Sequence, residues 1–475
     1  MVHQTNGDGS TLQSRADRFD AGKRLRSRTP RESHADYTAD GQRNPIAILS
    51  EADATRIPEL LPLRYRRMAA SPFAFLRGAA AVMAHDLGSM PSAGIPVHAC
   101  GDCHLMNFNA FSTPENDVLF DINDFDETLP GVDFTVDLKR LVASVAVAAR
   151  DAGMDEKTAR SIARSTARAY REFMITLAKL DPLKIWHTRM VLEREVKLID
   201  DAKLRNRILA QLAKAEKDPA ADDNFPHLAT VKGGELRIED RPPTIYHLND
   251  AKDAQHTIRA RSVFAAYDKS LPPERRVLVD RYTLRDLAFK VVGVGSVGTF
   301  CAVGLFATGD GEPLFLQIKE AQTSVLEHLA HAPPIAHQGQ RVVEGQKIMQ
   351  AASDIFLGWT DEQKTGRFFY VRHLKNRRLG WMGEAMKDDA LTAYATLCGR
   401  TLARAHARSG DPATLAGYMG KGQVLDDAMA SFAMAYAAQT KRDHTALTRW
   451  LEKSGAPKLK EKRHESPGKA GHARH

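Results

Sequence analysis

Cysteine is scarce in this 475-residue chain, and the four that occur are too few for a disulfide scaffold. No run of about 18 consecutive apolar residues is present, which excludes a membrane-spanning helix. Residues 1–50 are polar and lack the apolar core of a secretion signal. We therefore expect a cytoplasmic protein with no membrane partner.

A broad excess of positive charge is also missing. The net charge is +8, but residues 456–475 hold six Lys and Arg against two acids, a surplus of four and therefore half of the total. Such tails are usually disordered and solvated. We predict a disordered basic tail there and do not expect nucleic acid as a partner.

The remaining composition is that of a globular protein, with 43% hydrophobic and 27% charged residues. At roughly 150 residues per domain, the length suggests two or three domains. Helical and strand-like patterns alternate along the chain, and the strand-like runs fall into two clusters. The predicted fold class is α+β.

The first strand-like cluster carries a dense group of acidic residues. Residues 101–107 read Gly-Asp-Cys-His-Leu-Met-Asn, and residues 120–127 read Phe-Asp-Ile-Asn-Asp-Phe-Asp-Glu. Between them, residues 108–119 contain a turn flanked by apolar runs, so a hairpin would place the acidic segments side by side. Phosphoryl transfer uses this chemistry, because a carboxylate orients the nucleophile while Asp and Asn oxygens hold Mg²⁺. The alternative is a polar turn with helix-capping carboxylates.

This pattern resembles the catalytic loop and metal-binding segment of the protein-kinase-like superfamily, especially its aminoglycoside and choline kinases. The resemblance implies that Asp102 is the catalytic carboxylate, Asn107 a metal ligand and Asp124 the principal metal ligand, with Asp126 and Asn123 in support. Longer strings, among them SPFAFLRGAA and RVVEGQKIMQAASD, resemble a bacterial family catalogued as domain of unknown function 2252. That resemblance covers residues 28–444.

The second strand-like cluster contains a glycine motif, with Gly293, Gly295 and Gly298 in the pattern GxGxxG. A strand follows the motif, and strand, glycine loop, strand is the kinase arrangement that covers nucleotide phosphates. The third strand ends in Lys319, which the resemblance assigns to phosphate contact. We predict Glu344 on the next helix as its ion-pair partner and Glu327 as second choice. A snorkelling lysine at a sheet edge is the alternative.

The order of the motifs departs from ordinary kinases, because the glycine motif follows Asp102 by about 190 residues. We therefore predict a two-lobed, protein-kinase-like fold with helical insertions. Either this fold is circularly permuted, or one of the two resemblances is false. Asp411 is a second candidate for the catalytic position. The expected divisions are a disordered basic arm (1–43), a catalytic-loop and metal-binding segment of a helical lobe (44–150), a helical insertion (151–235), a β-rich nucleotide-binding lobe (236–380), a helical remainder of the catalytic lobe (381–455) and the tail (456–475).

Cys100 to His104 also match Cys-x-x-Cys-His, the attachment pattern of c-type haem. Haem attachment takes place in an oxidising compartment, so we do not expect it here. A redox pair or half of a zinc site stays open, although Cys301 and Cys398 supply no second Cys-x-x-Cys. We favour two small, partly buried cysteines.

The sequence thus predicts an ATP- and Mg²⁺-dependent phosphotransferase acting on an unknown hydroxyl of a small molecule or protein. Gly293, Gly295 and Gly298 would cover the phosphates of ATP. A nucleotide-binding regulator and a nucleotidyl transferase stay open as alternatives, as does a basic nucleic-acid-binding or scaffold protein. The acceptor cannot be read from the sequence.

Overall fold

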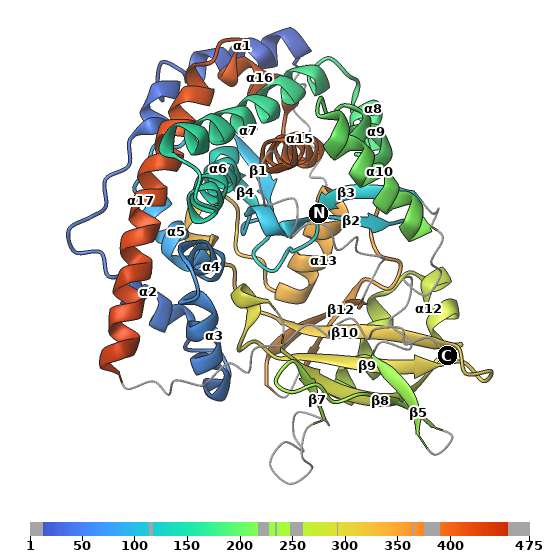
Figure 1. The fold of residues 1–475 in the computed structure, drawn as a ribbon. Helices are drawn as coiled ribbons and strands as arrows, with labels where there is room; N and C mark the ends of the chain where they lie inside the picture. The colour runs from blue at the N-terminus through green and yellow to red at the C-terminus, as the bar shows by residue number, and fades with distance from the viewer. Residues whose placement is uncertain are drawn as a thin grey trace, which may run out of the picture.

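The fold is mixed α+β, as the sequence predicts, with most of the chain helical and one large antiparallel sheet (Figure 1). The computed structural model describes residues 13–113, 117–216, 228–232, 235–247, 260–291, 293–362, 365–374 and 390–454. The predicted tail at 456–475 lies outside them. No helix in these ranges has the length and apolar character needed to cross a bilayer.

Helices form most of the structure and enclose the largest apolar core. Helix α6 is buried along almost its whole length. The helices are α1 (Arg15–Leu25), α2 (Pro45–Ala52), α3 (Leu61–Met68), α4 (Pro72–Gly78), α5 (Ala80–Leu87), α6 (Phe134–Asp151), α7 (Glu156–Leu177), α8 (Pro182–His187), α9 (Leu192–Lys197), α10 (Ala202–Glu216), α12 (Pro273–Val279), α13 (Gln338–Met349), α15 (Ala390–Ser409), α16 (Pro412–Met419) and α17 (Val424–Lys453).

Two small antiparallel pairs lie among these helices. Strand β1 (Pro96–Ala99) pairs with β4 (Leu129–Asp133), and β2 (Phe108–Ser112) pairs with β3 (Val118–Ile122). The second pair confirms the hairpin predicted between the two acidic segments. Phe120 on β3 lies opposite Ala110 on β2, and both side chains are fully buried in the helical core.

The second part is a six-stranded sheet in the order β11-β12-β10-β9-β8-β7, antiparallel throughout. Apolar side chains alternate along β9, so that Ala302 and Phe306 pack on one face while Val303 and Leu305 pack on the other. The strands are β5 (Ala229–Lys232), β6 (Glu235–Ile238), β7 (Ile245–Tyr246), β8 (Thr283–Lys290), β9 (Cys301–Ala307), β10 (Pro313–Ala321), β11 (Gly358–Glu362) and β12 (Arg367–His373). Strands β5 and β6 form a separate hairpin whose turn, 233–234, is outside the described residues.

One predicted helix is broken in two. The pattern from residue 72 to 87 predicts a continuous helix, but α4 ends at Gly78 and α5 begins at Ala80. The Gly78 carbonyl accepts a hydrogen bond from Arg64 Nη2 at 2.7 Å. A Cβ at Gly78 would lie 2.5 Å from Met68 Cγ, so the glycine lets α3 approach α4 closely. The break leaves the Gly78 carbonyl free to accept a hydrogen bond from α3, whereas in a continuous helix it would accept one from the helix itself.

The prediction of a disordered arm over residues 1–43 is wrong from residue 13 onward. Helix α1 packs on α16, where a Cβ at Gly22 would lie 2.1 Å from the Thr414 carbonyl oxygen. Beyond α1, buried His34 shares a 2.7 Å hydrogen bond between its Nε2 and the Tyr418 hydroxyl. Close backbone contact at small residues such as Gly22 holds this segment against α16. The polar composition of the segment gives no sign of that contact.

An ionic contact ties the edge of the six-stranded sheet and gives a pH prediction. His247 bonds Asp286 at 3.0 Å and Asp240 at 2.8 Å, and these carboxylates raise the pKa of His247 to about 9. A raised pKa stabilises the fold fully below the unfolded value, about 6.5, and the gain is lost as pH rises through 9. We expect the melting-temperature gap between wild type and His247→Gln to shrink over that range. A constant gap would contradict this.

Candidate active site

The first acidic segment lies in a loop that leaves β1 and packs against the second acidic segment. Gly101 has φ of +87°, and a Cβ there would lie 2.3 Å from the Glu127 carbonyl oxygen, so only glycine allows the approach. Asp137 on α6 holds the loop by accepting hydrogen bonds from the amides of Cys100 (2.7 Å) and Gly101 (3.0 Å). The residue that follows, Asp102, is thereby placed beside the second segment.

Asp102 is itself engaged in an ion pair. Its Oδ1 accepts a hydrogen bond from Arg140 Nε at 2.6 Å, and Arg140 Nη2 also contacts this oxygen. Burial raises the pKa of Asp102, and Arg140 opposes this shift. The other carboxylate oxygen, Oδ2, lies 3.6 Å from the position of a Cβ on Gly295. One oxygen is therefore fixed by Arg140, while the other faces the glycine segment.

Asn107 closes the same loop. Its Nδ2 donates to the Asp102 carbonyl oxygen, and its own carbonyl accepts from the Asn123 amide at 2.8 Å. The base of the β2–β3 hairpin thus joins the two acidic segments. Asn107 braces Asp102 in this structure and is not among the side chains that line the neighbouring cavity. Metal ligation by Asn107 stays a prediction.

A second ion pair of the site joins the helical part of the fold to the six-stranded sheet. Lys319 on β10, 2% exposed, contacts Asp126 through its Nζ. Asp126 also accepts hydrogen bonds from the Ser296 hydroxyl (2.8 Å) and the Tyr370 hydroxyl (2.6 Å). Although burial opposes ionisation of Asp126, Lys319 and these donors hold its pKa below the usual range. Although burial alone would lower the pKa of Lys319, Asp126 raises it, so both groups are charged.

The predicted pairing of Lys319 with Glu344 is therefore wrong. Glu344 on α13 is exposed and accepts a hydrogen bond from Gln340 Nε2 at 2.7 Å. The second choice, Glu327, is also exposed. Helix α13 instead directs Arg341 toward the site, where Nη2 donates to the Asp126 carbonyl at 2.8 Å.

Asp124 lies two residues before Asp126 and lines the same cavity. Burial raises the pKa of Asp124, and the nearby Asp126 carboxylate raises it further. Lys319 and Arg372 act in the opposite direction. Asp124 is thus a carboxylate crowded by a like charge, and a divalent cation would relieve that repulsion.

A cavity of about 270 Å³ opens between these groups and the N-terminal helices. Its wall combines carboxylates with arginines from three short segments. The residues that line it include Arg56, Arg64, Arg77, Asp102, Asp124, Asp126, Glu127, Gly295, Ser296, Thr299, Glu320 and Gln322. Acidic groups that can hold a cation thus face basic groups that can hold an anion.

Arg77 is the most available of the cationic groups. Its Nε is buried and has no hydrogen-bond partner in the described part of the chain. Burial lowers the pKa of Arg77, and Asp102 opposes the shift. By contrast, Arg64 is occupied, since its Nη1 donates to the carbonyls of Val294 (2.7 Å) and Gly295 (3.0 Å). Sequence reasoning missed these arginines; Arg77 lies inside the string SPFAFLRGAA, which carried no chemical motif.

The glycine motif lies between β8 and β9, as predicted, but its three glycines differ in position. Gly295 lines the cavity. Gly298 has φ of +94° and gives its carbonyl to the Ile57 amide at 2.7 Å, and Arg56 packs on it. Gly293 is exposed, with open space around the position of a Cβ. Only the middle glycine therefore reaches the cavity.

Asp411 and the two cysteines of the first acidic segment are not among the residues that line this cavity. Asp411 caps α16 by accepting from the Ala413 amide at 3.1 Å, and it pairs with Arg18 at 2.7 Å. Cys100 and Cys103 are fully buried free thiols, not partly buried as predicted. With Asp137 they place three possible ligand atoms within 4.8 Å of one another. Burial raises the pKa of both thiols, which favours their protonated form.

Comparison with known proteins gives one family. A family model described as an uncharacterized protein conserved in bacteria (DUF2252) matches residues 56–450. No curated protein and no solved structure matches the chain. The matched range contains Asp102, Asp124, Asp126, Lys319 and the glycine motif.

Proposed function

The chain belongs to this bacterial family, and we propose that it is an ATP- and Mg²⁺-dependent phosphotransferase with a protein-kinase-like arrangement of its site. One observation carries the proposal. Asp102, Asp124 and Gly295 line one cavity, and Lys319 binds its neighbour Asp126, although these residues come from segments about 170 to 190 positions apart. A chance cluster of capping carboxylates would not require a buried lysine and a glycine loop beside it.

The nucleotide-binding half of the proposal rests on β8, β9 and β10. These are three successive antiparallel strands, with a glycine segment between the first two and a buried lysine on the third. The arrangement resembles that of kinases, in which a glycine-rich loop covers the phosphates and a lysine contacts them. In this reading Gly295 allows the loop to approach the phosphates, and Lys319 reaches them. Arg77, which also lines the cavity, adds a buried Nε without a hydrogen-bond partner in the described part of the chain. Guanidinium and ammonium groups are the common phosphate contacts of proteins.

The donor set also fits a magnesium ion. Asp124 and Asp126 offer hard oxygen atoms, the ligands that Mg²⁺ prefers. We assign Asp124 as the principal ligand, because Asp126 already accepts from Lys319, Ser296 and Tyr370. When bound, Mg²⁺ would neutralise negative charge on the phosphates.

Asp102 has the position to act on the acceptor. In the proposed step an acceptor oxygen forms a bond to the γ-phosphorus of ATP, the bond from that phosphorus to the β-phosphate oxygen breaks, and ADP leaves. The acceptor proton passes to Asp102 Oδ2, since Oδ1 is held by Arg140. The catalytic segment precedes the glycine segment in the chain, so the proposal includes a circular permutation of the kinase order.

The ion pair of Asp102 with Arg140 favours one alternative, a nucleotide-binding regulator that no longer transfers phosphate. A carboxylate held by arginine is a weaker base than a free one. Products formed from ATP labelled at the γ- or α-phosphate separate the possibilities. Transfer of the γ-label supports a phosphotransferase, transfer of the α-label a nucleotidyl transferase, and transfer of neither a regulator.

Nucleotide binding should depend on a divalent cation. We expect ATP to raise the melting temperature only when Mg²⁺ is present, because a ligand of the native state stabilises it by RT ln(1 + [L]/Kd). Without the ion, Asp102, Asp124 and Asp126 repel the triphosphate. Differential scanning fluorimetry with ATP, Mg²⁺ or both measures this. Equal stabilisation by ATP in the presence of a chelator would contradict Asp124 as a metal ligand.

A further inference from the structure

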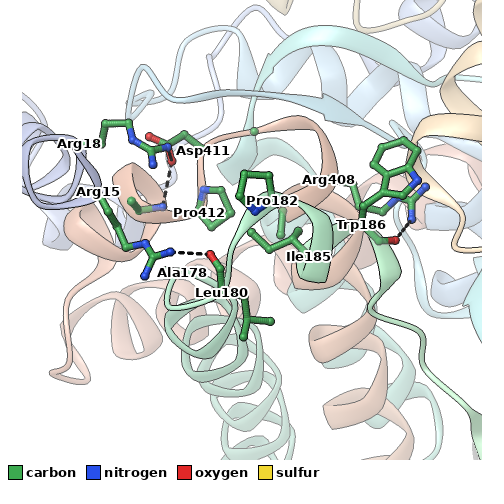
Figure 2. Close-up of a pocket in the computed structure, with 13 residues that line it drawn as sticks. Arg15, Arg18, Ala178, Leu180, Pro182, Ile185, Trp186, Arg408, Asp411 and Pro412 are labelled. Carbon is green, nitrogen blue, oxygen red and sulfur yellow. Dashed lines mark hydrogen bonds and ion pairs between the residues drawn. The ribbon is translucent and has the colours of Figure 1, made fainter. Parts of the chain in front are cut away.

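A second cavity of about 270 Å³ lies apart from the catalytic one, between α1, the start of α8 and the turn from α15 to α16 (Figure 2). Its lining includes Arg15, Arg18, Arg408, Trp186 and Asp411. Helix α1 precedes the range matched by the family model, so a segment outside that range completes one wall. The phosphotransferase proposal makes no use of this cavity.

The lining is strongly basic. Three arginines line the cavity together with one carboxylate, Asp411, an excess of two positive charges. Asp411 pairs with Arg18 through Nη1, but Arg18 Nε is buried and has no hydrogen-bond partner within the described ranges. Arg15 donates hydrogen bonds to the carbonyls of Lys179 (2.8 Å) and Leu180 (2.9 Å), which are neutral acceptors. The residues that line the cavity therefore carry an excess of positive charge.

Apolar surface adjoins these charges. Trp186 on α8 is 47% exposed, and its ring lies against the Arg408 guanidinium, 3.7 Å from the ring centroid. Leu183, on the same short helix, is 67% exposed. Figure 2 shows Pro182 and Ile185 between the Arg15 side and the Trp186 side of the cavity. Exposed Trp beside Arg in a pocket is the composition that dominates binding energy at protein interfaces.

We propose that this cavity and the exposed face of α8 bind an acidic peptide segment of a partner protein. An apolar side chain of the peptide fills the cavity between Leu180, Pro182 and Ile185, and flanking carboxylates meet Arg18 and Arg15. Charge complementarity identifies the partner as acidic. The cavity volume of about 270 Å³ accommodates an apolar side chain of such a peptide. The exposed Leu183, which is not part of the cavity lining, extends the contact beyond the cavity, as a peptide requires.

The test uses the full-length protein and a fluorescein-labelled peptide in which Glu alternates with Leu and Phe. We expect saturable binding, measured by fluorescence anisotropy, that weakens as salt rises. Arg18→Gln and Trp186→Ala should each weaken binding about tenfold or more, the effect of losing one central contact. Arg24→Gln, an exposed arginine of α1 outside the cavity, and Val277→Ala, an exposed apolar residue of α12, are the matched controls.

Three results would overturn the inference. The first is the absence of binding at any peptide concentration tested. The second is equal binding of a peptide with Lys in place of Glu, or of a Glu-rich peptide without Leu and Phe, since neither offers both the charge and the apolar side chain. The third is an equal loss in the Arg24→Gln control, which would show attraction to the net charge of the helix. Unchanged melting temperatures of the two cavity variants show that a loss of binding is not a loss of fold.

Discussion

Replacing Lys319 with methionine is expected to lower the free energy of unfolding by about 3–5 kcal/mol, the usual cost of removing one partner from a buried ion pair. In the variant the Asp126 carboxylate keeps hydrogen bonds only from two neutral donors, the hydroxyls of Ser296 and Tyr370. Methionine keeps most of the volume of the side chain, so the change removes charge without opening a large cavity. Urea unfolding followed by circular dichroism measures the loss.

A double variant separates the charge effect from packing. Asp126→Asn combined with Lys319→Met should recover much of the loss, because the carboxylate that Lys319 contacts is then neutral as well. Lys197→Met is the matched control, since Lys197 pairs with Glu193 on the surface of α9 and its removal should change stability little. A loss for Lys319→Met no larger than the control would show that water reaches the Asp126 pair.

The local parts of the site could be predicted from the sequence. The acidic segments, the β2–β3 hairpin and the β9–β10 hairpin follow from apolar alternation and turn residues close together in the chain. Lys319 could be singled out because an ionic residue ending an apolar strand needs a partner. Its partner could not be chosen, because Asp126 is 193 positions away and the nearer acid, Glu344, points to solvent.

The arginines of the site lay beyond sequence reasoning for a related reason. Arg140 acts through a tertiary hydrogen bond to Asp102, and Arg77 lines the same cavity as Asp102. An arginine in a helix is most often only a solvated side chain. The N-terminal segment shows the same limit. Arg26 donates to the Tyr418 carbonyl at 2.8 Å, so a polar helix is held by carbonyl groups that have no sequence signature. Composition indicates how much apolar surface a segment can bury. It does not indicate which backbone carbonyls elsewhere in the fold will accept its hydrogen bonds.

Asp102→Asn and Asp124→Asn are expected to fail in different ways. Asp102 is proposed to take the acceptor proton, so its loss should slow turnover by roughly 10²- to 10⁴-fold and leave Mg·ATP binding intact. Asp124 is proposed to hold the metal, so its loss should weaken Mg·ATP binding itself. Asn is nearly isosteric with Asp, and removing one of the crowded carboxylates relieves repulsion in the free protein. Calorimetric titration reports binding, and release of labelled phosphate reports turnover.

Asp117→Asn provides the control, because Asp117 is an exposed carboxylate beside the β2–β3 hairpin, outside the cavity, with a surface contact to Arg189. It should match wild type in both measurements. If Asp102→Asn abolished binding while Asp124→Asn bound normally, the two roles would be reversed. Wild-type turnover in both variants would move the catalytic centre away from this cavity. One further outcome supports the nucleotide-binding regulator. In that case Mg·ATP binds, Asp124→Asn weakens the binding and Asp102→Asn does not, but even the wild type shows no turnover. The ion pair between Asp102 and Arg140 would then account for the lack of transfer.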